Sequence, residues 1–200
     1  MIINTRVRLL FAFVMLGFSL NQAAVAQISN PFGPDKTIVQ QKQDILKKND
    51  EILKHLYRVE PKAKELIEKS VGYATFSNFG MKILIAGGGS GSGVVINKSN
   101  TKPIYMNMAE VQAGIGLGIK SFQNIFVFQT EAALNDFVNS GWTFGGQVTA
   151  AAKYEKTGDA YQDATLVAPG VLMYQITDSG LAAEITGKGT KYYKNSDLNK

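Results

Sequence analysis

Glycine alternates with apolar residues in the stretch Ala113-Gly-Ile-Gly-Leu-Gly-Ile119. Side chains of an extended strand point to opposite faces at every second residue, so this stretch would present one apolar face and one face of glycine alone. A face made only of glycine permits close approach by another backbone, a helix or a ligand. The stretch is therefore predicted to be a closely packed strand of a glycine-rich sheet.

Short β-branched or aromatic segments, separated by glycine or by Asn/Ser turns, fill the chain from Gly72 onward. The first four are predicted as consecutive strands of an antiparallel meander, at 72–77, 82–86, 93–97 and 103–107. Further strands are expected at 113–119, 124–129, 142–149, 171–176, 181–185 and 191–193. The glycine-rich segment 87–93 is expected to be a tight or bulged connection, and 177–180 a turn.

An amphipathic helix is predicted over 36–58, before the first strand. Its apolar residues repeat at helical spacing along one line: Ile38, Ile45, Ile52 and Leu56. The charged residues on the opposite face have mixed signs, which is typical of a solvated surface. We expect this helix to pack on its own domain or on a partner, and the alternative is that it lies on a membrane.

Two shorter helices complete the helical prediction. Pro61 suits the first turn of a helix over 62–69. Thr130 is an expected N-cap for a helix over 131–139, which would end at Gly141. The expected fold class is α+β: two N-terminal helices followed by a glycine-rich, mainly antiparallel sheet, open or barrel-like, with one inserted helix.

The N-terminus has the pattern of a secretory signal peptide. Arg6 and Arg8 precede the apolar run 9–20, and Ala24-Val25-Ala26 follows. A transmembrane anchor is the alternative, but the run is shorter than the about 20 residues needed to span a bilayer. We expect cleavage between Ala26 and Gln27 and a soluble, exported chain that is periplasmic or secreted. The lead 27–35 would be flexible, and 36–200 would form a single domain.

The basic charge is concentrated in the predicted first helix. The formal net charge of +5 falls to +3 without Arg6 and Arg8, and residues 36–58 alone carry six basic and three acidic side chains. The rest of the exported chain is therefore neutral overall. Proteins that bind duplex nucleic acid have stronger basic fields, so nucleic acid is not an expected partner.

The residue types of most catalytic sites are missing. The chain has no cysteine and one histidine, His55, which we expect at the surface, so disulfides, thiol nucleophiles and zinc sites built on Cys and His are excluded. The glycines of 87–93 do not have the spacing of a phosphate loop or a serine elbow. The acidic residues that could pair as catalytic carboxylates are expected to be surface residues instead: Asp159 with Asp163, and Asp178 with Glu184. No enzyme activity, metal or cofactor is expected.

Five motifs in a fixed order resemble the SYLF domain family, over about residues 60–187. They are Gly72-Tyr-Ala-Thr-Phe, Gly87-Gly-Gly-Ser-Gly-Ser-Gly-Val-Val, Gln112-Ala-Gly-Ile-Gly-Leu-Gly, Phe126-Val-Phe-Gln-Thr with Ala133-Leu-Asn-Asp-Phe137, and Trp142-Thr-Phe-Gly-Gly. Members of this family are non-enzymatic binders of phosphoinositides or other anionic lipids in exported bacterial proteins and in eukaryotic membrane-traffic and actin-patch proteins, and some eukaryotic members bind actin.

The resemblance implies that this chain is an exported lipid-binding protein that associates peripherally with anionic membrane phospholipid in the cell envelope. It makes Lys82, beside the glycine-rich strand, a candidate contact for a lipid headgroup. Lys47, Lys48 and Lys54 of the predicted first helix are further candidates, because each lysine near an anionic surface adds roughly 1 kcal/mol of attraction. The alternative is a structural or interaction module of the periplasm that binds an envelope protein partner and no lipid.

Overall fold

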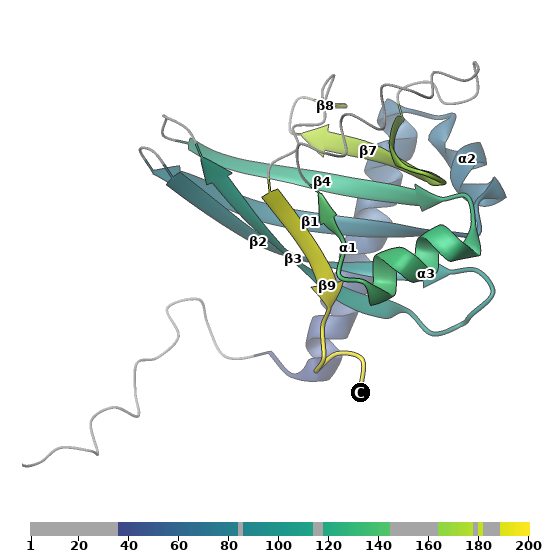
Figure 1. Ribbon diagram of the computed structural model, residues 1–200, viewed down its shortest axis with the longest axis horizontal. Coiled ribbons are helices and arrows are strands. Elements are labelled where there is room, and N and C mark those ends of the chain that lie inside the picture. The colour runs from purple at the N-terminus through teal and green to yellow at the C-terminus, as the bar shows by residue number, and fades with distance from the viewer. Residues whose placement is uncertain (1–35, 84–85, 114–117, 145–163, 178–179, 182–188) are drawn as a thin grey trace, which may run out of the picture. The chain divides into compact units, whose positions relative to one another are not determined.

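The computed structural model describes residues 36–83, 86–113, 118–144, 164–177, 180–181 and 189–200. All helices and strands of these ranges lie in one unit, Thr37–Lys200. The helices are α1 (Ile38–Val59), α2 (Ala63–Lys69) and α3 (Glu131–Asn139). The strands are β1 (Gly72–Ile83), β2 (Ala86–Asn97), β3 (Ile104–Ala113), β4 (Gly118–Phe128), β5 (Thr143–Phe144), β6 (Thr165–Ala168), β7 (Val171–Thr177), β8 (Gly180–Leu181) and β9 (Gly189–Lys194). The α+β prediction with one inserted helix is confirmed (Figure 1).

The strands described form one antiparallel sheet in the order β5-β9-β3-β2-β1-β4-β7-β6, with β8 paired to β7. The first three strands pair in sequence, as a meander does. The four segments predicted for the meander lie in three strands, because 72–77 and the start of 82–86 both belong to β1. Strand β4 returns to the free edge of β1. The hairpin of β1 and β2 therefore lies between β3 and β4.

The glycine-rich segment Gly87–Gly93 is not a connection, which corrects the prediction. It lies inside β2. On one side it pairs with β1, without a register shift, from Lys82↔Gly87 to Phe76↔Gly93. On the other side it pairs with β3. Glycine weakens a strand through its own conformational freedom, but hydrogen bonding along both edges holds this segment extended. The predicted strand 72–77 likewise continues to Ile83, and Ala86 already belongs to β2.

The predicted strand over 113–119 is also wrong, because its ends belong to two strands. Ala113 ends β3 and pairs with Ala86, whereas Gly118 begins β4 and pairs with Lys82. Other predictions lie outside the described residues: the segment 1–35, the strand residues 145–149 and 182–185, and the acids Asp159, Asp163, Asp178 and Glu184.

Helix α3 has the predicted boundaries. The Thr130 hydroxyl accepts a hydrogen bond from the Ala133 amide (3.2 Å), which satisfies one of the unpaired donors of the first turn. Gly141, just beyond the helix, has a φ of 65°, a left-handed conformation that glycine adopts at low cost. The helix buries Leu134, Phe137 and Val138 against the sheet.

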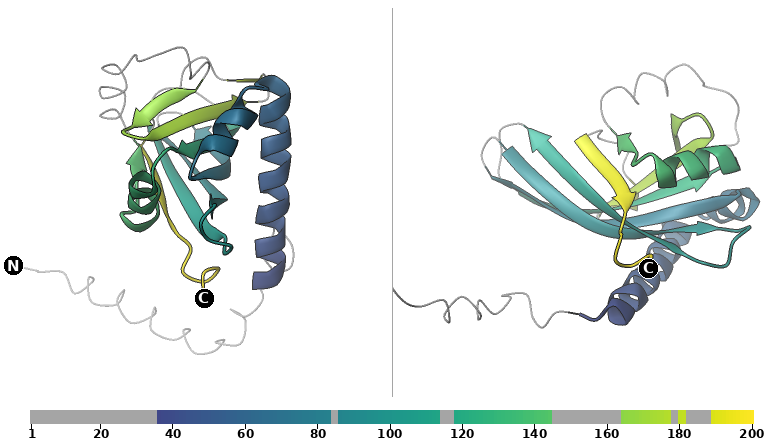
Figure 2. Two further views of the ribbon diagram at one scale, coloured as in Figure 1. Left: turned by 90° about the vertical axis from the view of Figure 1, so that its right-hand side faces the viewer. Right: turned by 60° about the horizontal axis from the view of Figure 1, so that its bottom comes forward.

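Helices α1 and α3 cover opposite faces of the sheet (Figure 2). On the α3 face, Phe76, Phe126, Phe137 and Tyr192 pack with ring centroids 4.7–6.1 Å apart. Gly93 lies opposite Phe76, and a Cβ at this position would overlap the Phe76 ring and the Thr75 carbonyl. Glycine is therefore required here by the close approach of a neighbouring strand.

Helix α1 packs on the other face of the sheet, which agrees with the prediction that it packs on its own domain. Ile52 and Leu56 lie against β4 and β7, and Ile45 lies against Val94 and Tyr105. Ile38 was expected on the same apolar line, but it is 47% exposed because the helix extends beyond the sheet at that end. No helix in the described part of the chain is long and apolar enough to cross a membrane.

Candidate functional site

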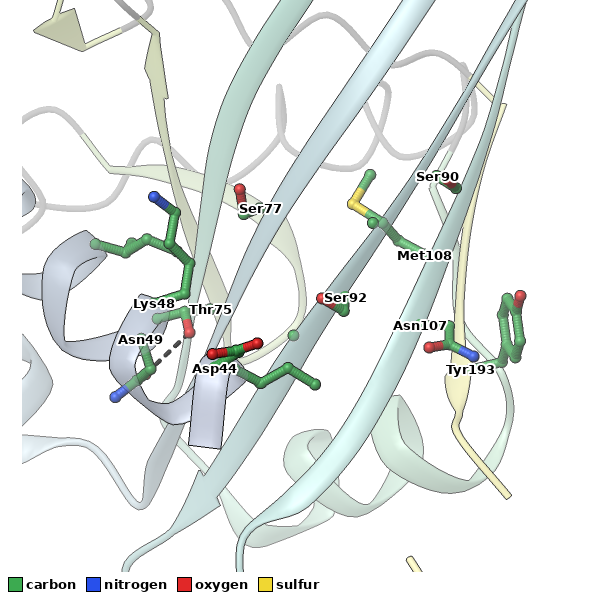
Figure 3. Close-up of a pocket in the computed structure, with 14 residues that line it drawn as sticks. Asp44, Lys48, Asn49, Thr75, Ser77, Ser90, Ser92, Asn107, Met108 and Tyr193 are labelled. Atoms are coloured by element: carbon green, nitrogen blue, oxygen red, sulfur yellow. Dashed lines mark hydrogen bonds between the residues drawn. The ribbon is translucent and has the colours of Figure 1, made fainter. Parts of the chain in front are cut away.

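A groove of about 730 Å³ lies between α1 and the sheet. One wall comes from the middle of α1, and the floor from β1, β2, β3 and β9 (Figure 3). A volume of this size is in the range of small-molecule binding sites. Most side chains on its floor are hydroxyl or amide groups, which distinguishes the groove from the apolar contacts of α1 farther along the helix.

Two local sequence features place α1 over this floor: an N-terminal capping box and an apolar stripe that packs on the sheet. Thr37 and Gln40 form a reciprocal capping box, in which the Gln40 amide donates to the Thr37 hydroxyl (3.2 Å) and the Thr37 amide donates to the Gln40 side chain (2.9 Å). Ile45 and Ile52 are buried on either side of one polar residue, Asn49. The helix therefore starts at a defined residue and presents one polar group to the sheet.

Asn49 forms a buried hydrogen bond with the floor of the groove. The Thr75 hydroxyl donates to the Asn49 side-chain oxygen at 2.9 Å, and the two residues are 1% and 5% exposed (Figure 3). Burial raises the pKa of the neighbouring Tyr73 hydroxyl, and a hydrogen bond with Asn49 partly opposes that shift. Sequence reasoning missed Asn49, although one polar residue on an apolar stripe was the available signal.

Four polar side chains form a row across four adjacent strands. Ser77 on β1 lies opposite Ser92 on β2, Ser92 opposite Asn107 on β3, and Asn107 opposite Tyr193 on β9. All four line the groove, together with Ser90 one pleat farther along β2. Partners on adjacent antiparallel strands face the same side of a sheet, so the register itself aligns these groups. We refer to Ser77, Ser92, Asn107 and Tyr193 as the polar row.

Two charged side chains of α1 border the polar row. Asp44 and Lys48 line the groove on its helical side. The Lys48 ammonium also donates to the Glu51 carboxylate (3.1 Å), a half-exposed ion pair on the helix. The groove therefore has charges of both signs at one margin and neutral polar groups on its floor.

A smaller cavity of about 240 Å³ continues from the groove on the far side of Lys48 and Ser77. It contains His55, which we predicted at the surface. His55 is partly exposed, and its Nδ1 lies 3.4 Å from the Gln123 side-chain oxygen on β4. The register brings β4 beside β1 at this point, so the helix margin faces a neighbouring strand and not open solvent.

The four predicted lysines fall in different places. Lys47 and Lys54 are exposed on α1, two turns apart, and neither has an ion pair with another described residue. Lys48 lies at the groove margin. Lys82 lies near the end of β1, opposite Gly87 on β2 and Gly118 on β4, and its side chain is outside the described part of the structure. The roles of all four in lipid binding stay predictions.

The described residues contain no cluster of three or more His, Cys, Asp or Glu side chains that would hold a metal ion. No imidazole is among the described residues that line the groove, because His55 lies in the smaller cavity with its Nδ1 3.4 Å from the Gln123 side-chain oxygen. What the site offers is a set of neutral hydrogen-bonding groups on a rigid sheet.

Two comparisons relate the chain to known proteins. Residues 109–200 match the Ysc84 family model, described as Las17-binding protein actin regulator. The chain is also similar to beta cell expansion factor A of Aeromonas veronii, with 31% identity over 152 residues that cover 74% of this chain and 55% of the relative. The chain thus spans about half the length of this curated relative.

Proposed function

Residues 109–200 of this chain belong to the Ysc84 (SYLF) domain family, and on this premise we propose that the chain is an exported protein that associates peripherally with anionic membrane lipid in the cell envelope. The SYLF domain is a lipid-binding domain of actin-patch proteins, and its family is not known for enzymatic activity. The predicted signal peptide supports export.

The outer surface of α1 is the observation that carries this proposal. Lys47 and Lys54 are exposed on the same side of the helix, away from the buried stripe. At the N-terminal end of the helix, Ile38 and Val39 are 47% and 63% exposed. Exposed lysines on the outer side suit a helix that rests on an anionic surface while its buried stripe stays on the sheet, and the exposed apolar end of the helix would bury further area there.

A vesicle co-sedimentation assay tests the proposal with residues 27–200. The two lysines together contribute about 2 kcal/mol near an anionic surface. The variant Lys47→Glu/Lys54→Glu should therefore bind anionic vesicles at least about thirtyfold more weakly than the parent. Raising the salt concentration should weaken parent binding, because exposed charges are screened.

The matched control is Lys102→Glu/Lys194→Glu, which makes the same change in net charge at two exposed lysines outside α1. It should bind as the parent does. Lys82→Glu, tested separately, should weaken binding if Lys82 contacts a headgroup. If the parent pellets with no vesicle, an envelope protein partner replaces lipid as the proposed ligand. If both double variants lose binding equally, net charge is responsible and α1 is not the contact.

A further inference from the structure

The polar row has hydrogen-bonding capacity that the described part of the chain does not use. The hydroxyls of Ser77, Ser90 and Ser92 make no hydrogen bond with another described residue. The Asn107 side-chain oxygen accepts from Asn195 (3.1 Å), and its amide nitrogen donates to no described residue. The floor of the groove therefore presents hydroxyl donors, hydroxyl acceptors and an amide donor toward its interior.

The spacing of these groups is regular because adjacent strands fix it. Neighbouring strands lie about 4.8 Å apart, so four strands hold the polar row over about 14 Å. Single hydroxyls on a flexible loop would lose conformational entropy when they bind, whereas these are already ordered by the sheet. An extended ligand with several hydroxyl groups matches a row of this kind.

The charges beside the groove disfavour an anionic ligand. Lys48 is already bonded to Glu51 (3.1 Å), and the Asp44 carboxylate at the same margin would repel a phosphate. The Asn49 side-chain oxygen already accepts a hydrogen bond from the Thr75 hydroxyl, and its side-chain nitrogen donates to Asp50. The groups that remain for a ligand are uncharged, whereas the outer face of α1 carries the exposed, positively charged lysines.

We propose that the groove beneath α1 binds a neutral saccharide through the polar row, with sugar hydroxyls hydrogen-bonded to Ser77, Ser92 and Asn107 and the Tyr193 ring at one end. The volume of about 730 Å³ accommodates two linked sugar rings. Apolar carbon on the sugar rings would lie against Ile45, which also lines the groove. This site is separate from the outer face of α1 and does not depend on the proposed lipid contact.

The test titrates the 15N-labelled chain, residues 27–200, with maltose, cellobiose and di-N-acetylchitobiose, and with inorganic phosphate as the charged comparison. At least one disaccharide should cause saturable shifts of the Ser77, Ser92 and Asn107 amide resonances. The variant Ser77→Ala/Ser92→Ala removes two hydroxyls and should weaken that binding about tenfold or more. Because Ser77 is partly exposed and Ser92 exposed, its thermal unfolding midpoint should equal that of the parent.

The control is Thr165→Val, which removes an exposed hydroxyl from β6 at the other edge of the sheet and should leave binding unchanged. A second arm separates the sources of the sugar with neutral phosphatidylcholine vesicles that contain digalactosyldiacylglycerol. Serine-dependent binding to these vesicles indicates a lipid-borne sugar, and binding of soluble disaccharide alone indicates a free one. The proposal is overturned if no disaccharide or glycolipid binds, if only phosphate binds, or if the serine variant binds as the parent does.

Discussion

The buried hydrogen bond between Asn49 and Thr75 leads to a quantitative prediction about why a polar residue interrupts the apolar stripe of α1. Asn49→Leu places a side chain of similar size between Ile45 and Ile52 and leaves the Thr75 hydroxyl, 1% exposed, without its acceptor. Thr75→Val does the reverse and leaves the Asn49 oxygen without its donor. Each change thus buries one unsatisfied polar group.

An unsatisfied buried hydrogen-bonding group costs about 1–3 kcal/mol, whereas replacing both partners by apolar groups of the same shape is nearly neutral. Each single variant should therefore lose about 2 kcal/mol of unfolding free energy. The double variant Asn49→Leu/Thr75→Val should lose clearly less than the two single losses together, although it still lacks the hydrogen bond between Asn49 and Tyr73. For a domain of this size, about 2 kcal/mol lowers the unfolding midpoint by roughly 4–8 °C.

Urea unfolding of the four proteins, followed by far-UV circular dichroism, completes a double-mutant cycle. Gln43→Leu, an exposed position of the same helix, is the control for added apolar surface and should change stability by less than about 0.5 kcal/mol. The reasoning is refuted if the double variant loses as much as the two single variants together, because Asn49 and Thr75 would then act independently.

Three further perturbations test other parts of the fold. Gly93→Ala should destabilise the chain by about 1–3 kcal/mol in urea unfolding, because the added methyl overlaps the Phe76 ring. Thr130→Ala should lose about 1 kcal/mol in the same assay, because the Ala133 amide loses its cap. Burial raises the pKa of Tyr192 above the usual tyrosine range. The stability that this shift contributes is complete below about pH 10 and is lost as the pH rises further. The variant Tyr192→Phe should therefore show a smaller fall in its thermal unfolding midpoint at high pH than the parent.

The helices were predicted well because their signals are local. The α3 boundaries 131–139 match the structure, and the predicted 36–58 and 62–69 differ by at most two residues from α1 and α2. A cap such as Thr130 and a stripe such as Ile45, Ile52 and Leu56 are set by residues within a few positions of each other. Such patterns are readable without knowing what the helix packs against.

The strand errors have a different cause, because pairing partners are distant in the sequence. Gly87–Gly93 has a low intrinsic preference for strands, and only its registers with β1 and β3 hold it extended. The segment 113–119 has a regular alternation, yet Ala113 and Gly118 pair with different neighbours on either side of the β1–β2 hairpin. Period alone does not state where one strand ends and the chain crosses to another.

The groove was not predicted for the same reason. Ser77, Ser92, Asn107 and Tyr193 are spread over more than one hundred residues, and only the sheet register aligns them. Sequence reasoning favoured lysines instead, because charge is visible in composition. Lys47 and Lys54 do lie on an exposed surface, but a lysine pattern does not indicate a neutral site on the other side of the same helix.

Strand β2 connects the core to the groove through its two faces. Gly93 faces Phe76 and leaves room for the aromatic cluster under α3, while Ser92, its neighbour, faces α1 and belongs to the polar row. Because successive residues of a strand alternate between faces, a one-residue slip of β2 would place serine against Phe76 and glycine beneath α1. The steric requirement at Gly93 therefore fixes the register that aligns Ser92 with Ser77 and Asn107. It follows that a substitution such as Gly93→Ala should disturb the groove as well as the core, because its added methyl would overlap the Thr75 carbonyl as well as the Phe76 ring.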